Sequence, residues 1–223
     1  MRMFSLGENA VTVELGDAIS EDLNRRAIAL SHDLAERPFA GFVEAVPSYA
    51  SVTAFFDVAA VRRANPWTSS ACEVVRAEME SRLAALEPCV VSEEPRTVEV
   101  LVDFSEGPDL EMAAASCGIS VPEFIEIFTA RPYRVFMIGF QPGFAYMGQI
   151  NECISLPRLA TPRLRVPKGS VGIAGRQTGI YPFDSPGGWQ LIGRTDVELF
   201  RPLEDPPTLF KPGDMCRFVD VGG

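Results

Sequence analysis

The fold of the C-terminal part of this chain is decided by Gly139-Phe140-Gln141-Pro142-Gly143-Phe144-Ala145-Tyr146, followed by Pro167-Lys168-Gly169-Ser170-Val171, Gln177-Thr178-Gly179-Ile180-Tyr181-Pro182 and Ser185-Pro186-Gly187-Gly188-Trp189-Gln190. Glycine and proline at this density disfavour helices. They specify turns and places where the backbone closely approaches another backbone or a ligand. These segments therefore predict short strands joined by tight turns.

The stretch that contains these segments, residues 131–194, is also basic. It carries a net charge of +6, whereas the whole chain of 223 residues carries −10 and the remainder therefore −16. A basic, glycine-rich segment in an acidic protein indicates a site for a small anion, either a carboxylate or a phosphate. The acidic balance of the chain argues against nucleic acid as a main partner. The charged residues of the stretch are Arg131, Arg134, Arg158, Arg163, Arg165, Lys168, Arg176 and Arg194 against Glu152 and Asp184.

Strand patterns continue on both sides of these segments. Val98, Val100, Val102 and Phe104 alternate with other residues, as in a half-buried strand. Further strands are expected at residues 133–140, 169–175, 189–193, 196–200 and 214–221. Short strands separated by Pro/Gly turns favour a closed barrel or a sandwich.

Two short helices are expected at residues 109–116 and 121–129. Gly118 ends the first helix, and Ser120 caps the second. The pair has the spacing of a helix-turn-helix, but the second helix carries Glu123 and Glu126 and no basic residue before Arg131. Phosphates would repel such a helix, so the pair is interpreted as packing helices.

The N-terminal part is expected to be an α+β unit. Its predicted elements run strand 11–15, helix 20–36, strands 42–46 and 52–56, and helix 70–86, where Ser70 and Glu73 form a capping-box pattern. The order β-α-β-β-α suggests a small sheet with helices on one face, as in ferredoxin-like folds. Residues 88–95 are the expected linker, which gives an N-terminal domain over residues 1–90 and a C-terminal domain over residues 91–223.

The residue content of the chain excludes several classes of protein and of catalytic site. No run of about 18 apolar residues indicates a membrane span, and the N-terminus does not resemble a signal peptide. The five cysteines are odd in number and widely spread, as in a protein with reduced thiols in a cytoplasm. The single histidine, His32, lies off the apolar stripe of its predicted helix and is expected to be exposed. One histidine cannot build a multi-histidine metal site. The presence of a single, exposed histidine also argues against a Ser-His-Asp catalytic triad or a Cys-His catalytic pair.

Several cationic side chains are candidates for binding the anion. Arg163 and Arg165 are two residues apart, so on an extended segment they face the same side and could hold a carboxylate or phosphate. Lys168, beside Gly169, is one of two lysines, and Arg194 closes the basic stretch. The alternative is a solvated edge strand for the arginines and plain surface for the lysine.

The aromatic residues of the first segment are candidate walls of a pocket. Phe140, Phe144 and Tyr146 flank the turn at Pro142 and Gly143. The segment lacks the Gly-Lys-Ser/Thr ending of a phosphate-binding loop. The alternative is a turn whose aromatic rings fill one end of a barrel.

Polar and backbone groups complete the candidate set. Gln177 and Thr178 are suited to orienting an amide, and the N–H groups of Gly187 and Gly188 to binding an oxyanion. Trp189 is expected in the core. Asp184 and Glu152 are the only nearby acids and hence the only local candidates for a general base. Lys168 is a further catalytic candidate. Beyond these candidates, the sequence assigns no catalytic residue.

Taken together, the four segments resemble the family called KipI, allophanate hydrolase subunit 1 or the B subunit of 5-oxoprolinase. Pro157-Arg158, Pro162-Arg163 and Gly175-x-Gln177 extend the resemblance, as do the more weakly matching Val46-Pro47-Ser48-Tyr49-Ala50-Ser51 and Pro212-Gly213-Asp214. The resemblance implies an N-terminal α+β domain and a C-terminal cyclophilin-like β-barrel.

The resemblance also implies an activity. Members work with a KipA-type protein (the C subunit of 5-oxoprolinase, or allophanate hydrolase subunit 2). Together with an A-type subunit, they form an ATP-dependent 5-oxoprolinase that converts 5-oxoproline to glutamate. On this basis the chain is expected to be the B subunit of such an enzyme, inactive alone, and to take a small anionic amide as substrate. Allophanate hydrolysis, urea-carboxylase-type chemistry and inhibition of a sensor histidine kinase stay open as alternatives.

One residue departs from the family pattern. A histidine is expected near the end of the helix that precedes the first segment, and this chain has Phe128 followed by Thr129 there. If that histidine acts in catalysis, this chain lacks it or uses a substitute.

Overall fold

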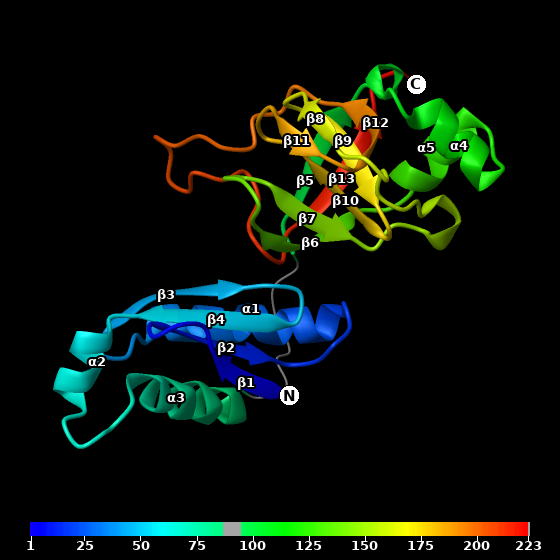
Figure 1. The fold of residues 1–223 in the computed structure, drawn as a ribbon. Coiled ribbons are helices and arrows are strands. Elements are labelled where there is room, and N and C mark those ends of the chain that lie inside the picture. The colour runs from blue at the N-terminus through cyan, green and yellow to red at the C-terminus, as the bar shows by residue number, and fades with distance from the viewer. Residues whose placement is uncertain (87–94, 223) are drawn as a thin grey trace. The chain divides into compact units, whose positions relative to one another are not determined.

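The structure, a computed structural model, describes residues 1–86 and 95–222 (Figure 1). The chain divides into two compact units, Met1–Glu94 and Pro95–Gly223. The linker predicted at residues 88–95 lies, except for Pro95, outside the described residues, and so does Cys89.

The first unit is a four-stranded antiparallel sheet with three helices. Its strand order is β1-β2-β4-β3, so the edge strand β1 takes the place that the last strand has in a ferredoxin-like sheet. The predicted β-α-β-β-α order is observed, and β1 and α2 are additions to it. The elements are β1 (Arg2–Ser5), β2 (Ala10–Glu14), α1 (Glu21–Glu36), β3 (Phe42–Pro47), β4 (Ser51–Phe56), α2 (Val58–Ala64) and α3 (Ala71–Ala85).

Apolar periodicity places the core of this unit on one face of the sheet. Val13 on β2 is paired with Val52 on β4, and both are fully buried. They pack against Leu30 of α1 and Met79 of α3. The hydroxyl of Ser70 accepts a hydrogen bond from the Glu73 amide at 3.4 Å, which confirms the predicted cap. The helices therefore cover one face, as predicted.

The second unit contains a seven-stranded sheet in the order β12-β9-β10-β7-β6-β13-β5 and a separate ribbon of β8 and β11. Among the described strands of this unit, only β13 and β5 pair in parallel. The elements are β5 (Thr97–Val102), η1 (Phe104–Glu106), α4 (Leu110–Cys117), α5 (Val121–Thr129), β6 (Tyr133–Ile138), β7 (Ala145–Gly148), η2 (Glu152–Ile154), β8 (Arg163–Val166), β9 (Ser170–Ala174), β10 (Gln177–Ile180), β11 (Ser185–Gly187), β12 (Gln190–Arg194) and β13 (Met215–Asp220).

Two backbone hydrogen bonds join the ends of the two edge strands of this sheet. The Asp103 amide donates to the Arg194 carbonyl at 2.8 Å, and the Arg194 amide donates back at 2.9 Å. Pairing edge strands satisfies backbone groups that would otherwise be exposed. The sheet is thus a nearly closed barrel, and the barrel rather than the sandwich alternative is correct.

Side chains alternate between the two faces of this sheet. On β7, Met147 belongs to the main core, whereas Tyr146 belongs to a second cluster. On β12, Ile192 and Leu191 divide in the same way. The aromatic residues of the quoted segments therefore lie on the face opposite to the main core, where Val166 of the β8–β11 ribbon packs against them.

One predicted strand is wrong. Residues 196–200 form no ladder, and only Phe200 makes an isolated bridge, with Thr208. Leu199 is buried, which explains the alternating pattern. Its carbonyl accepts a hydrogen bond from the Leu209 amide at 3.0 Å, so the segment bonds to a local loop and not to a neighbouring strand.

The two helices α4 and α5 pack on the barrel core. Gly118 ends α4 in the left-handed conformation, with φ of 73°, as predicted. Phe128 is fully buried and stacks on Phe218 with ring centroids 5.0 Å apart. The position where the family pattern suggests a histidine is thus a core position in this chain. Among the described residues, no single helix is long and apolar enough to cross a membrane. Of these residues, only α4 and α5 taken together, a pair bent between the two helices, have the required length and apolar composition.

Candidate functional site

Five aromatic side chains gather on the outer face of the barrel, and we call them the aromatic cluster. Phe144 is at its centre, with ring centroids 4.8 Å from Tyr146, 5.4 Å from Phe140, 5.5 Å from Tyr181 and 5.6 Å from Trp189. All four contacts are edge-to-face, the geometry that aromatic quadrupoles favour. Trp189 is 5% exposed, so its predicted core position is correct.

Glycines in the strands let these rings lie directly on the sheet. A Cβ atom on Gly179 would come within 3.0 Å of the Phe144 ring, and one on Gly172 within 3.1 Å of the Trp189 Cβ. Such contacts are tighter than a real side chain tolerates without movement. The glycine in the Gln177–Pro182 segment therefore serves the packing of the aromatic cluster.

The turn at residues 140–143 places one aromatic ring at the surface. Phe140 has φ of 68°, a conformation uncommon for a residue with a side chain, and is 59% exposed. Gly143 has φ of 82°, and a Cβ there would lie 2.8 Å from the Leu199 carbonyl oxygen. Pro142 is exposed. This loop therefore supplies one exposed ring, from Phe140, beside the buried Phe144.

Two tyrosines of the cluster have perturbed acidities. Burial raises the pKa of Tyr146, and the nearby Arg158 partly opposes the shift. Burial likewise raises the pKa of Tyr181, opposed by a backbone hydrogen bond with Trp189 and by Arg158. Both phenols are therefore neutral at physiological pH, and both sense the charge of the same arginine.

Arg158 was not among the predicted site residues. Its neighbours hold it at the start of β12, because the Leu159 amide donates to the Gly188 carbonyl at 2.7 Å and the Gln190 side chain donates to the Pro157 carbonyl at 3.1 Å. Trp189 lies between these two anchor points. The signal that pointed to this residue was its place in the Pro157-Arg158 pair within the basic stretch.

A second group of predicted residues meets around Asp184. The Arg165 side chain donates to Asp184 at 2.8 and 2.6 Å, and the backbone amide of Lys168 donates to it at 2.8 Å. These two contacts, the amide first, hold the pKa of Asp184 below its usual value. A carboxylate stabilised in this way is a weaker base, so the contacts favour an anchoring role for Asp184.

The charge of Arg194 also reaches Asp184, while its guanidinium pairs with Glu106 at 3.1 Å. Arg165, Lys168 and Arg194 thus all lie near Asp184. We call Arg165, Lys168, Asp184 and Arg194 the basic end. The ammonium group of Lys168 is exposed, and the described part of the chain offers it no ion-pair partner.

Arg163 has a different role from its neighbour Arg165. Its guanidinium donates to the carboxylate of buried Asp109 at 2.5 Å and to the Trp189 carbonyl at 3.3 Å. The β8–β11 pairing shifts register between Ser185 and Gly187. The two arginines therefore bind different carboxylates, and the structure does not bring them onto one ligand.

The remaining predicted residues make contacts within the fold. Thr178 is fully buried and donates to the Gly172 carbonyl at 2.9 Å. Gln177, on β10, pairs with Ala174. A Cβ on Gly187 would lie 2.5 Å from the Tyr181 hydroxyl, and the Gly188 carbonyl accepts the Leu159 bond given above.

Three buried side-chain polar atoms lack a hydrogen-bond partner among the described residues. They are Oε1 of Gln141, Oγ of Ser185 and Oε1 of Gln190. All three belong to the basic stretch of residues 131–194. Buried polar groups are almost always satisfied, so such a concentration is expected where a ligand or ordered water binds. Within the same described residues, no group of three or more His, Cys, Asp or Glu side chains is arranged to hold a metal ion.

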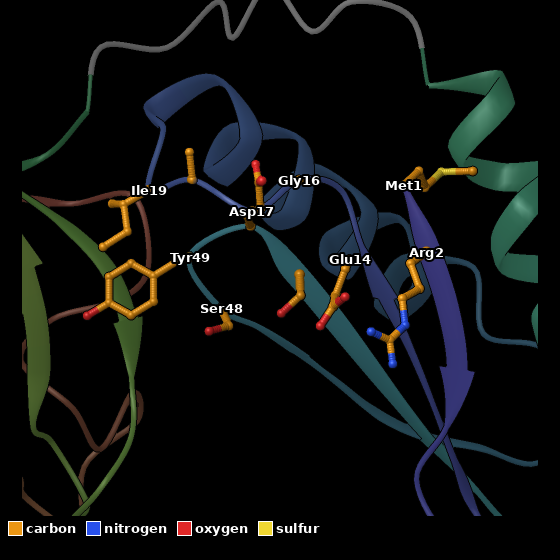
Figure 2. A pocket seen from close by; sticks show the side chains of 11 residues that line it. Met1, Arg2, Glu14, Gly16, Asp17, Ile19, Ser48 and Tyr49 are labelled. Atoms are coloured by element: carbon orange, nitrogen blue, oxygen red, sulfur yellow. The ribbon is translucent and has the colours of Figure 1, made fainter.

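A hollow of about 610 Å³ lies in the first unit, and none of the predicted site residues lines it (Figure 2). Arg2 and Glu14 line one side of it, and Ser48 and Tyr49, from the turn between β3 and β4, line the other. Tyr49 belongs to the Val46–Ser51 segment of the family resemblance. The sequence contained no further sign of this hollow.

Comparisons with known proteins give the chain its family. The family model described as "Carboxyltransferase domain, subdomain C and D" matches residues 1–210. The chain is 43% identical over 220 residues to the protein named as the B subunit of 5-oxoprolinase in Bacillus subtilis (strain 168), covering 97% of this chain and 91% of that protein. The protein of the same name from Escherichia coli O157:H7 is 40% identical over 220 residues, covering 98% and 95%.

A solved structure has the same fold. The crystal structure of TTHA0988 is 34% identical in sequence and superposes with a TM-score of 0.80. The alignment covers 96% of this chain but 40% of that chain. The fold of this protein therefore also occurs as part of a longer polypeptide.

Proposed function

Because the chain belongs to the carboxyltransferase domain, subdomain C and D, family, we propose that it is the B subunit of an ATP-dependent 5-oxoprolinase. The observation that carries the proposal is the sequence identity of 43% and 40% to proteins named as B subunits of 5-oxoprolinase. Each alignment covers nearly the whole length of this chain and of the other protein. At this identity and coverage, a common role within the complex is the simplest inference.

The reaction opens a five-membered cyclic amide. Water adds to the amide carbon, the ring C–N bond breaks, and the nitrogen becomes the amino group of glutamate. Amides are poor electrophiles, and hydrolysis of ATP supplies the driving force. The protein must therefore hold the substrate carboxylate, orient the amide and stabilise negative charge on its oxygen.

The second unit offers groups for binding rather than for bond cleavage. The aromatic cluster provides an apolar edge at the exposed Phe140 and the half-buried Tyr146, and the exposed Lys168 provides positive charge. No metal cluster is found among the described residues, and the single histidine pairs with Glu36 on the exposed side of α1. This supports a protein that contributes part of a substrate site and is inactive alone.

The proposal requires partners. A B subunit belongs to a complex, and the longer chain of TTHA0988 supports a second protein that adjoins this one. We assign that place to a C-type subunit of the KipA kind, with an A-type subunit completing the enzyme. ATP binds to the complex, and the free cysteines Cys72, Cys117, Cys153 and Cys216 suit the reducing cytoplasm.

The test is reconstitution with one component left out. The chain is mixed with the A-type and C-type subunits of the same organism, and 5-oxoproline-dependent ATP hydrolysis is measured. We expect activity in the complete mixture and its loss when this chain is omitted. Full activity without this chain would remove it from the enzyme. Activity on allophanate and none on 5-oxoproline would assign it to amide hydrolysis in urea degradation instead.

A further inference from the structure

Two arginines, Arg158 and Arg163, lie beside the aromatic cluster, and they differ in whether a carboxylate neutralises their charge. Both act on the Tyr181 hydroxyl electrostatically. The guanidinium of Arg163 is neutralised by Asp109 at 2.5 Å. Arg158 is exposed, and the described residues contain no carboxylate within ion-pair distance of it. The cluster therefore has one structural arginine and one arginine whose charge is uncompensated.

The backbone around Arg158 is fixed rather than loose. Two hydrogen bonds, from Leu159 to Gly188 at 2.7 Å and from Gln190 to Pro157 at 3.1 Å, hold it across from Trp189. Gln190 is 9% exposed, and its Oε1 has no partner among the described residues. An arginine on a well-held segment loses less conformational freedom on binding a ligand than one on a mobile loop.

We propose that Arg158 and the aromatic cluster form a binding site for a monocarboxylate that carries a flat amide ring, the chemical class to which 5-oxoproline belongs. This inference rests on the proposed function for the identity of the ligand. Arg158 pairs with the carboxylate, and the ring lies against the half-buried Tyr146, whose own ring contacts Trp189 with centroids 6.0 Å apart. The guanidinium binds a carboxylate through two parallel N–H bonds, which fixes the orientation of the ring.

The size of the charge favours a carboxylate over a phosphate at this position. A phosphate carries about two negative charges and is usually held by several cations or by successive backbone amides. Arg158 is one uncompensated cation, because Arg163 is paired with Asp109. At the basic end, Arg165 pairs with Asp184 and Arg194 pairs with Glu106, so Lys168 is the one cation there that no carboxylate of the described residues neutralises.

The chain carries a reporter for this site. It has two tryptophans, Trp67 and Trp189. Trp67 is 98% exposed in the first unit, so Trp67→Phe removes it without disturbing packing. In the Trp67→Phe chain, the fluorescence of Trp189 is titrated with 5-oxoproline and, as an uncharged lactam of the same ring size, with 2-pyrrolidinone.

We expect a saturable fluorescence change with 5-oxoproline and at least tenfold weaker binding of 2-pyrrolidinone. Arg158→Gln should weaken 5-oxoproline binding about 10- to 100-fold, the value of a charge-assisted hydrogen bond. Arg176→Gln is the matched control, because Arg176 is an exposed arginine of the same unit that pairs with Glu152 at 2.8 Å. Equal responses in Arg158→Gln and Arg176→Gln, or no saturable response at all, overturn the proposal.

The same variants are then tested in the reconstituted complex. We expect Arg158→Gln to raise the KM for 5-oxoproline about 10- to 100-fold with little change in kcat, and Arg158→Lys to restore part of the loss. An unchanged KM overturns the site even if the complex is a 5-oxoprolinase. If the wild-type complex has no 5-oxoproline-dependent activity, the proposed function fails, and the Trp189 titration still decides whether Arg158 binds monocarboxylates.

Discussion

Replacing Arg163 by alanine should destabilise the second unit, because it leaves a buried charge without its partner. Asp109 is 4% exposed, and its two carboxylate oxygens accept from Arg163 at 2.5 Å and from the Leu191 amide at 2.6 Å. Removing one partner of a buried ion pair costs about 3–5 kcal/mol. The Arg163 side chain is 28% exposed and Leu191 still donates, so we expect the lower end, about 3 kcal/mol.

The measurement is urea unfolding at neutral pH in the Trp67→Phe background, so that Trp189 reports on the second unit. Arg176→Ala is the control, since it removes an exposed arginine whose pair with Glu152 should be worth no more than about 1 kcal/mol. The double variant Asp109→Ala with Arg163→Ala should cost less than the sum of the two single changes. If Arg163→Ala shifts the midpoint no more than Arg176→Ala does, the reasoning about this ion pair is refuted.

Three further predictions concern packing, acidity and thiol reactivity. Gly179→Ala should lower the free energy of unfolding by about 2 kcal/mol, since its Cβ would lie 2.8 Å from the Ala145 carbonyl oxygen; a urea midpoint like the wild type's would contradict this. Asp184 should titrate below 3.8 by carboxyl-carbon NMR, and the stability that it contributes should be present above that pH and fade as the pH falls further; a midpoint at or above 3.8 would count against the Lys168 and Arg165 contacts. Cys153 is exposed and should react with a thiol reagent in the native state, whereas Cys216, whose pKa burial raises, should react only on unfolding; equal rates would contradict the burial of Cys216.

Local signals in the sequence predicted the elements whose causes are local. Ser70 and Gly118 mark a helix start and a helix end through contacts within a few residues, and both are observed. Alternating apolar residues predicted β4 and β5 because one face of each strand is buried. The same alternation predicted β2, although Thr12 on its other face is buried as well. Such features do not depend on which distant segment a strand pairs with.

Features that depend on distant partners could not be predicted in the same way. Residues 196–200 have a strand-like pattern, but no neighbouring strand is available to them. The short strand β11 was hidden because proline and glycine occupy two of its three positions. For β8, an edge strand was only the alternative to an anion site at Arg163 and Arg165. Closure of the barrel depends on Asp103 meeting Arg194, and nothing in either residue indicates that contact.

The candidate site shows the same division. The sequence offered Arg165 and Lys168 as anion-binding candidates and Asp184 as a candidate general base, without predicting that the three meet. It placed Arg163 with Arg165 by spacing alone and could not anticipate that Asp109 binds Arg163. Arg158 became a candidate only when the structure placed it beside the aromatic cluster.

The most direct test of the account is the formation of glutamate from labelled 5-oxoproline by the complete complex, measured by mass spectrometry with and without this chain. The account predicts ATP-dependent glutamate formation that requires this chain and falls at subsaturating substrate in Arg158→Gln but not in Arg176→Gln. Glutamate formed at the same rate in the absence of this chain would contradict it.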